Sequence, residues 1–265
     1  NRCKFCAFSR SKGEPGSYEM SIDDILNKAR SAEKGVRELH IVSGLHPDLP
    51  FEWYLDMLRA LKREFPKIHL KAFTAVEIDY LSKLAGLSLT DTLLKLKEAG
   101  LGSLPGGGAE IFNVAVRNTL CAEKISGDRW LEVIEAAHAV GLKSNATMLY
   151  GHIETHEHRI DHLIRLRKLQ DKTGGFQAFI PLSFHSQNTE IKKTAYTTGF
   201  DDLKTLSISR LMLDNFDHIK AYWVMLGEKI SQVSLSFGVD DLDGTVVEER
   251  ITRAAGGTTD GSMAK

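Results

Sequence analysis

Short apolar runs alternate along this chain with longer stretches whose apolar residues recur at helical spacing. The short runs predict strands buried on both faces, and the longer stretches predict helices with one apolar face. The predicted strands lie at 38–44, 68–73, 101–104, 143–150, 175–182, 219–223 and 237–242. The predicted helices lie at 21–35, 51–65, 89–100, 128–140, 156–172, 201–215 and 225–235.

This alternation predicts an α/β protein with one parallel sheet and right-handed crossovers. The strand–helix units begin with a helix, so one further strand before Asn1 would complete a (β/α)8 barrel. The predicted fold is therefore a TIM-type barrel whose first strand is missing from the sequence. No linker or shift in composition divides the chain, so we predict one domain over 1–265, in which about 245–265 begins a truncated C-terminal extension.

Composition excludes several classes of protein. The 265 residues carry 34 basic and 35 acidic side chains, so no strongly basic field is present to hold a nucleic-acid backbone. No apolar run reaches the roughly 18 residues of a membrane span, and the polar start is not a signal peptide. Three cysteines are too few for a disulfide framework, which indicates a reducing, cytoplasmic compartment. Because the chain has no starting methionine and opens inside a motif, we expect residues to be missing at both ends.

Polar and glycine residues gather where the predicted strands end. In barrels of this kind the active site lies at the carboxyl ends of the strands. The residues concerned are His46, Glu77, Asn145, His152, Glu154, His185 and the segments 105–110 and 240–245. We therefore expect the chemistry of the protein at this end of the barrel.

Cys3 and Cys6 are the first candidate ligands. A lone C-x-x-C is weak evidence, because it fits half a zinc site, a redox pair or an inert pair. Zinc sites usually take a second pair of cysteines or histidines, and the chain offers only Cys121 in addition. Iron–sulfur clusters also use thiolates, and an iron without a protein ligand can bind a small chelating molecule. The pattern favours a cluster and leaves zinc open.

With the barrel pattern behind it, Cys3-Lys4-Phe5-Cys6-Ala7-Phe8 resembles the end of the C-x3-C-x2-C loop of radical S-adenosylmethionine (SAM) enzymes. The resemblance implies a 4Fe-4S cluster held by three cysteines, with the amino and carboxylate groups of SAM on the fourth iron. Cys3 and Cys6 would be two of the metal ligands. The first cysteine would lie four residues before Cys3, so the chain as it stands should bind the cluster poorly and is expected to be inactive.

Longer segments are similar to the aminofutalosine synthase family of menaquinone biosynthesis. They lie at 102–111, 124–127, 144–155, 174–182 and 240–245. The resemblance implies that SAM, after one-electron reduction, adds its 5′-deoxyadenosyl radical to 3-[(1-carboxyvinyl)oxy]benzoate, giving 6-amino-6-deoxyfutalosine, bicarbonate and methionine. It also implies a small-molecule substrate, an electron donor such as flavodoxin or ferredoxin, and no nucleic-acid or membrane partner. The alternatives are a hydrogen-abstracting radical cyclase of the same pathway (dehypoxanthine futalosine cyclase) and a metal-dependent barrel hydrolase that uses His152, Glu154 and His185.

Candidate cofactor-binding residues follow from position and chemistry. Glycine lets backbone approach a ligand closely and leaves N–H groups free, which fits a cradle. Asn145 and Thr147 share one strand face that should point into the barrel, where adenosine would lie. The Glu110 carboxylate suits a ribose hydroxyl or an amino group. The resemblance adds a turn that meets the methionine amino group and aromatic rings that shield the cluster. The full set is Phe5, Phe8, Ser43, Gly44, Gly106, Gly107, Gly108, Glu110, Asn145 and Thr147.

The candidate catalytic residues are His185, Glu77 and His152. His185 has a near-neutral pKa and follows a strand, so it suits acid–base chemistry or orientation of the substrate. Two cations, Arg10 and Arg117, are candidates for binding the two substrate carboxylates. We expect Cys121 to be an inert buried thiol. The neighbouring histidines are expected on a solvated helix face; they are His156, His158 and His162.

Overall fold

The computed structural model describes residues 2–32, 35–191, 197–244, 246 and 249–259. Parallel strands form a six-stranded sheet in the order β1-β2-β3-β4-β5-β6, so each strand lies beside its neighbour in sequence. The strands are β1 (Glu38–Ile41), β2 (His69–Ala72), β3 (Ser103–Leu104), β4 (Lys143–Tyr150), β5 (Phe176–Ser183) and β6 (His218–Ile219). This confirms the predicted α/β class with its parallel, sequential sheet.

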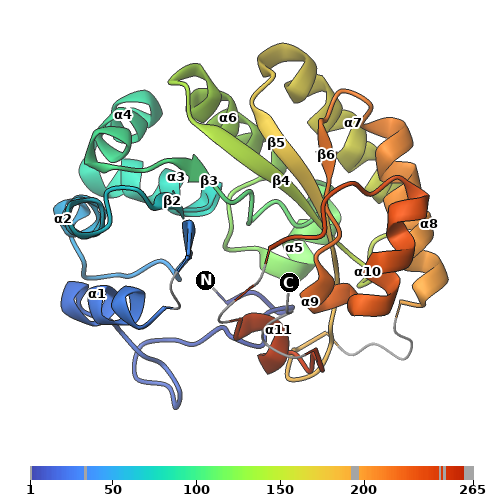
Figure 1. Ribbon diagram of the computed structural model, residues 1–265, viewed down its shortest axis with the longest axis horizontal. Coiled ribbons are helices and arrows are strands. Elements are labelled where there is room, and N and C mark those ends of the chain that lie inside the picture. The colour runs from blue at the N-terminus through green and yellow to red at the C-terminus, as the bar shows by residue number, and fades with distance from the viewer. Residues whose placement is uncertain (1, 33–34, 192–196, 245, 247–248, 260–265) are drawn as a thin grey trace.

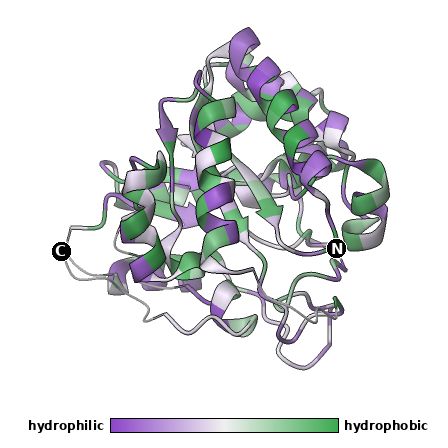
Figure 2. Cartoon of the chain, turned by 90° about the vertical axis from the view of Figure 1, so that its right-hand side faces the viewer, coloured by the Kyte–Doolittle hydropathy of each residue, from purple (hydrophilic) through white to green (hydrophobic). Residues whose placement is uncertain are grey.

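Most of the helices form an arc around the fan of strands, whereas α5, α9 and α11 lie nearer the centre of the view, below the strands (Figure 1). Those between or beside strands are α1 (Ile22–Ser31), α2 (Phe51–Glu64), α3 (Ala75–Ala85), α4 (Leu89–Ala99), α5 (Val114–Cys121), α6 (Gly127–Ala139), α7 (His156–Thr173) and α8 (Gly199–Met212). The last ones are α9 (Trp223–Leu226), α10 (Glu228–Ser234), the 3-10 turn η1 (Leu235–Phe237) and α11 (Ile251–Ala254). Hydrophobic and hydrophilic stretches alternate along them, as expected of helices that cover a sheet with one face (Figure 2).

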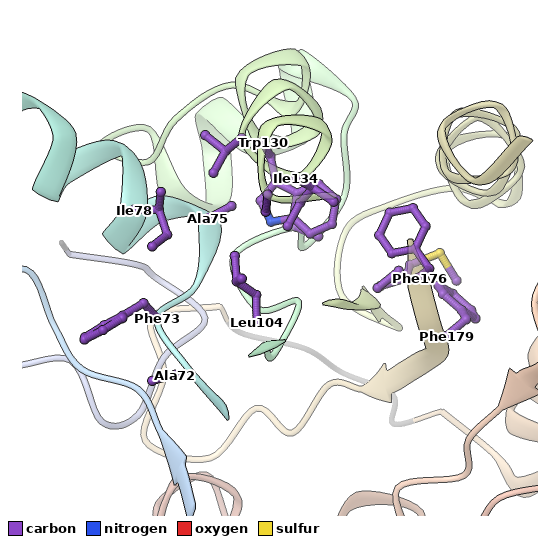
Figure 3. Packing of buried hydrophobic residues seen from close by; sticks show 14 of the residues in the cluster. Ala72, Phe73, Ala75, Ile78, Leu104, Trp130, Ile134, Phe176 and Phe179 are labelled. Carbon is purple, nitrogen blue, oxygen red and sulfur yellow. The ribbon is translucent and has the colours of Figure 1, made fainter. Parts of the chain in front are cut away.

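The hydrophobic core fills the layer between the sheet and the helices. Trp130 and Ile134 of α6 and Phe176 and Phe179 of β5 are buried there, and Leu104 of β3 lies between them and α3 (Figure 3). The opposite face of the strands lines the barrel interior. Because side chains alternate along a strand, this inner face carries the polar residues of β1, β2 and β4.

Several elements differ from the prediction, among them the strand expected at 219–223, of which β6 includes only Ile219, because α9 begins at Trp223. Residues 74–77, expected as a loop, begin α3, because Thr74 and Glu77 form a capping box in which each side chain bonds the other's backbone N–H. Helix α5 was not predicted at all. The predicted strand 237–242 is wrong as a strand: η1 takes its start, and only a parallel bridge from Lys220 to Asp241 joins the rest to the sheet. That bridge nevertheless places the segment beside β6, as a further barrel strand would be.

Candidate active site

The two N-terminal cysteines lie in one tight turn. The Cys6 N–H donates to the Cys3 carbonyl at 3.0 Å, and Cys3 is buried while Cys6 is half-buried. The turn is fixed from both sides, because the Lys4 N–H donates to the Leu120 carbonyl at 2.9 Å and the Glu190 N–H donates to the Lys4 carbonyl at 2.8 Å. The end of α5 therefore supports the thiols.

A buried ion pair lies under this turn. Lys124 Nζ is 2.7 Å from Glu110 Oε1 and 5.1 Å from the centroid of the Phe5 ring. Burial raises the pKa of the Cys3 thiol, and the positive charge of Lys124 acts in the opposite direction. Metal ligation needs the thiolate, so Lys124 favours the state in which Cys3 can bind metal.

The donor set fits part of a cluster site. Cys3 and Cys6 supply two thiol groups from one turn of backbone, whereas Cys121 is buried with a pKa raised to about 11 by burial. Across the described ranges, no group of three or more His, Cys, Asp or Glu side chains is arranged to hold a metal ion. This arrangement agrees with a three-cysteine cluster site of which Cys3 and Cys6 are two members. It does not agree with a zinc site whose ligands all lie within the described residues.

The glycine loop between β3 and α5 is held by its carbonyl groups. Thr147 Oγ1 donates to the Gly106 carbonyl at 2.8 Å, and Trp130 Nε1 donates to the Gly107 carbonyl at 3.1 Å. The buried Arg117 guanidinium donates to the Ala109 carbonyl at 2.5 Å. Arg117 is thus part of the scaffold of this loop, and the structure does not place it as a free cation for substrate.

Glycine is required in this loop by the close approach of backbone to backbone. Gly106 has φ of +84°, and a Cβ there would lie 2.3 Å from the Asn145 carbonyl oxygen. Gly108 has φ of +84° as well, and Glu110 follows with φ of +47°. Apart from the tight turn at 107–108, the N–H groups of 106–110 have no acceptor in the described chain. Alternation of left-handed residues with others turns successive N–H groups toward one concave side, which suits an electron-rich ligand.

Glu77 lies buried at the ends of β1 and β2. Its Oε1 accepts from Ser43 N–H and Oγ, each at 3.0 Å, and its Oε2 accepts from Thr74 N–H and Oγ1 at 2.8 and 2.9 Å. Burial raises its pKa, and these four donors oppose that rise. Ser43 and Gly44 themselves are exposed at the end of β1. The structure thus brings Glu77 to the predicted cofactor turn, where its carboxylate is bound by Ser43.

Asn145 and Thr147 lie on the inner face of β4, as predicted. Both are buried, while the alternate residue Ser144 bonds His138 of α6 on the outer face. Thr147 is occupied by the glycine loop. In the described part of the chain the Asn145 amide has no hydrogen-bond partner, so it is the residue of the two whose polar group is left for a ligand.

The histidine candidates lie elsewhere at this end of the barrel. His152 is enclosed in its own loop, where Nε2 lies 2.9 Å from the Leu149 carbonyl and Nδ1 lies 2.9 Å from Glu154 Oε2. His185 Nε2 lies 3.0 Å from the Met225 carbonyl, and the ring lines a cavity of about 290 Å³ between β5 and α8–α10, together with Asp202. The two residues are held by separate backbone partners, and catalytic roles for them stay predictions.

Phe8 and Arg10 are positioned by local contacts. The Phe8 ring meets the Tyr18 ring edge-on at 6.1 Å, and Arg10 Nη1 donates to the Ala7 and Ser9 carbonyls at 3.0 and 2.7 Å. Arg10 therefore braces the polypeptide that follows the cysteines. The role of the Phe5 and Phe8 rings in shielding the cluster stays a prediction.

One expectation about α7 is wrong. His162 does not lie on a solvated face: it is fully buried, its ring stacks on Phe112 at 3.9 Å, and its Nε2 lies 3.0 Å from the Thr147 carbonyl. Burial lowers its pKa to about 3. It supports the outer side of the strand that carries Asn145.

Sequence reasoning missed a charged group on the inner face of the barrel. His40 and Lys71 are register partners on β1 and β2, and Lys71 Nζ lies 3.0 Å from Glu38 Oε2. Lys220, after β6, lies 2.8 Å from Asp243 Oδ1. The protein around the His40 ring, and then the charge of Lys71, lower the pKa of His40. Polar and apolar residues alternate in 38–41 and 69–72. With the strand ends known, this alternation would have placed His40 and Lys71 on the face opposite the apolar residues.

Comparison with protein families gives the fold its context. Residues 1–166 match the model of the radical SAM superfamily, and residues 173–263 match the CofH/MqnC C-terminal region. The chain belongs to the radical SAM superfamily. It is therefore an enzyme of the kind that uses a 4Fe-4S cluster and SAM, as the cysteine turn predicted. No helix in the described ranges is long and apolar enough to cross a membrane.

Curated relatives narrow the family further. The chain is 49% identical to aminodeoxyfutalosine synthase of Thermus thermophilus over 99% of its own length and 72% of that protein. It is 45% identical to the synthase of Streptomyces coelicolor, over 96% of the chain and 68% of that protein. It is also 45% identical to 5-amino-6-(D-ribitylamino)uracil–L-tyrosine 4-hydroxyphenyl transferase of Methanothermobacter thermautotrophicus, over 96% of the chain and 71% of that protein.

Solved structures of low sequence identity share the fold. Methylornithine synthase (PylB) superposes with a TM-score of 0.70 at 18% identity, and the [FeFe]-hydrogenase maturase HydG with 0.66 at 17%. Each covers 91% of this chain, which spans 66% and 52% of those two chains. The likeness confirms the predicted radical SAM barrel.

Proposed function

We propose that the protein acts as an aminodeoxyfutalosine synthase in menaquinone biosynthesis. It would transfer the 5′-deoxyadenosyl group of SAM to 3-[(1-carboxyvinyl)oxy]benzoate with consumption of one water, releasing methionine and, from the substrate's carboxyl carbon, bicarbonate. The observation that carries this proposal is the 49% identity with the Thermus synthase over 99% of the chain. A flavodoxin or ferredoxin as electron donor and a cytoplasmic location belong to the same proposal.

The cofactor would be held at the carboxyl ends of the strands. When bound, the cluster supplies the single electron that cleaves SAM. Cys3 and Cys6 would ligate the cluster. The adenosine moiety would form hydrogen bonds with the free N–H groups of the 106–110 loop and with the Asn145 side-chain amide. Glu110 is already paired with Lys124, so its proposed contact with ribose would use the oxygen that Lys124 leaves.

The barrel interior supplies cations for a substrate with two carboxylates. Lys71 and Lys220 point inward with side chains only 12% and 14% exposed, and His40 lies near both charges. Each lysine has an acidic partner, so a carboxylate of the substrate would share the ammonium group with that partner and bind through its remaining N–H donors. We propose these residues in place of Arg117 as the carboxylate-binding group.

The hydroxyphenyl transferase activity of another relative is a second candidate function. The 45% identity with the hydroxyphenyl transferase equals that with the Streptomyces synthase. That enzyme's name gives its substrates as L-tyrosine and 5-amino-6-(D-ribitylamino)uracil, which lack the two carboxylates of the enol ether. The hydrogen-abstracting cyclase of the menaquinone pathway is the remaining radical alternative, and it would release free 5′-deoxyadenosine.

Product analysis separates these functions. The full-length protein is reconstituted anaerobically with iron and sulfide, reduced, and given SAM with each substrate in turn. An adenosyl adduct of the enol ether supports the synthase. Free 5′-deoxyadenosine with the tyrosine and ribitylaminouracil pair supports the transferase, and no adduct with the enol ether refutes the synthase assignment. Lys71→Met, compared with the surface variant Lys95→Met, should raise KM for the enol ether while leaving the affinity for SAM unchanged.

A further inference from the structure

Glu77 joins the two strand ends that flank the cofactor turn. Its carboxylate is 4% exposed and receives four hydrogen bonds, two from Ser43 at the end of β1 and two from Thr74 at the start of α3. A capping box needs only the bonds with Thr74. The pair of bonds to Ser43, 34 residues away in sequence, is therefore additional to helix capping.

A strained residue directs Glu77 to this position. Phe73, between β2 and α3, has φ of +60°, a conformation that a bulky side chain adopts only at a cost. Its N–H still donates to the Ile41 carbonyl at 3.2 Å, and its ring is buried against Tyr54. The backbone thus turns sharply after β2, and the first turn of α3 is brought over the end of β1.

Helix α3 also holds the rest of the loop that follows β1. Tyr80 Oη donates to the His46 carbonyl at 2.6 Å, one turn of α3 after Glu77. The His46 ring in turn accepts from the Asp48 and Leu49 N–H groups at 3.1 and 3.2 Å. Residues 43–49 are therefore fixed at two points by one helix.

We propose that Glu77 is a positioning residue for SAM, acting through Ser43. The carboxylate binds the Ser43 N–H, and Ser43 Oγ lies 3.0 Å from both Glu77 Oε1 and the Gly44 carbonyl, so these bonds fix the turn. The Ser43 carbonyl, which accepts no hydrogen bond from the described residues, is then a fixed acceptor at the mouth of the barrel. Such an acceptor suits a positively charged or neutral amino group, as in the methionine part of SAM. This assignment replaces the catalytic role predicted for Glu77, and it rests on the proposed use of SAM.

The test compares two variants that perturb opposite oxygens of one carboxylate. In Glu77→Gln, one oxygen becomes an NH2 group, which cannot accept from both Ser43 and Thr74. Thr74→Ala removes one bond to Oε2 and leaves Ser43 bound, so it is the matched control for helix capping. Loss of a charge-assisted bond corresponds to a change on the order of tenfold.

We expect Glu77→Gln to weaken SAM binding to the reconstituted cluster about tenfold, followed by the change in the cluster's electron paramagnetic resonance spectrum, with kcat at saturating SAM nearly unchanged. Amide exchange of 42–49 in the SAM-free protein should rise. Thr74→Ala should change neither, although it lowers stability. If both variants weaken SAM binding equally, or if amide exchange in 42–49 is unchanged in Glu77→Gln, the proposal is overturned.

A second variant tests the same contact, and the measurements distinguish failure of the positioning role from failure of the synthase assignment. Should Glu77→Gln fail to fold, Ser43→Ala removes one of the two donors and repeats the test with a smaller expected effect. The amide exchange and SAM affinity do not depend on the acceptor substrate. Wild-type protein that forms no adenosyl adduct would therefore refute the synthase assignment alone, whereas a normal Glu77→Gln variant would refute the positioning role alone.

Discussion

Arg117 offers the sharpest test of how the glycine loop is built. Its guanidinium is 4% exposed and donates to four carbonyls: Ala109 and Ile125 at 2.5 Å, Ile111 at 3.3 Å and Gly108 at 3.4 Å. In Arg117→Met the two close bonds are lost and their buried carbonyls have no donor. At about 1–3 kcal/mol for each unsatisfied group, the free energy of unfolding should fall by about 2–6 kcal/mol.

Urea unfolding of the variant and the wild type measures this loss. Arg117→Lys keeps the charge with a single donor point and should lose less. Arg210→Met is the matched control: Arg210 also donates to two carbonyls, of Gly238 at 2.7 Å and Phe216 at 3.1 Å, but far from the loop. Both variants should be destabilised, and only Arg117→Met should also weaken SAM binding. The reasoning fails if Arg117→Met keeps its stability within about 0.5 kcal/mol and loses affinity for the dicarboxylate substrate alone.

Three further outcomes follow from buried groups. Burial lowers the pKa of His162 to about 3, so the stability that its neutral form contributes is present above the unfolded pKa of 6.5 and is lost as pH falls. The free energy of unfolding should therefore drop by about 2 kcal/mol between pH 7 and pH 5, and the drop should be smaller in His162→Gln. Burial alone would raise the pKa of Glu154, but His152, the Gly151 N–H and Arg159 lower it to about 2, so Glu154→Gln should flatten the loss of stability between pH 4.5 and 2 in urea titrations. Gly106→Ala, measured by thermal unfolding, should lose well over 1 kcal/mol through its positive φ and its contact with Asn145, whereas Gly44→Ala, with open space at its Cβ, should change stability little.

The hydrophobic pattern was sufficient for the class of fold. The predicted strand at 143–150 coincides with β4, although the polar residues Ser144, Asn145 and Thr147 interrupt the apolar residues along it. All of its residues except Lys143 are buried, as expected of a strand that is covered on both faces. The pattern failed at 74–77, where Thr74 and Glu77 carried a capping-box signature that was interpreted as a loop. Short strands such as β3 and β6, with two residues each, leave too few positions for periodicity to define their ends.

The sequence predicted where the site lies, but not the contacts that its side chains make. Strand ends correctly marked where polar residues gather, since parallel strands all deliver their carboxyl ends to one edge. Direction could not be predicted: a histidine at 162 is equally compatible with solvent or with Phe112 until the roll of α7 is known. The same holds for Arg117, whose carbonyl partners depend on how the glycine loop closes.

The anchoring of the cysteine turn has a consequence for the order of assembly. Its backbone bonds join Lys4 to Leu120 and to Glu190, and its Arg2 N–H donates to Glu123, so these three anchors lie more than a hundred residues away, in addition to local bonds such as those from Arg2 to Ser11 and Glu14. Contacts of such long sequence separation form late, because the intervening chain must first be ordered. We therefore expect the thiols to reach their final positions only after β1 to β5 have paired. An iron–sulfur cluster would be inserted into a nearly finished barrel, and cluster loading becomes a report on late folding.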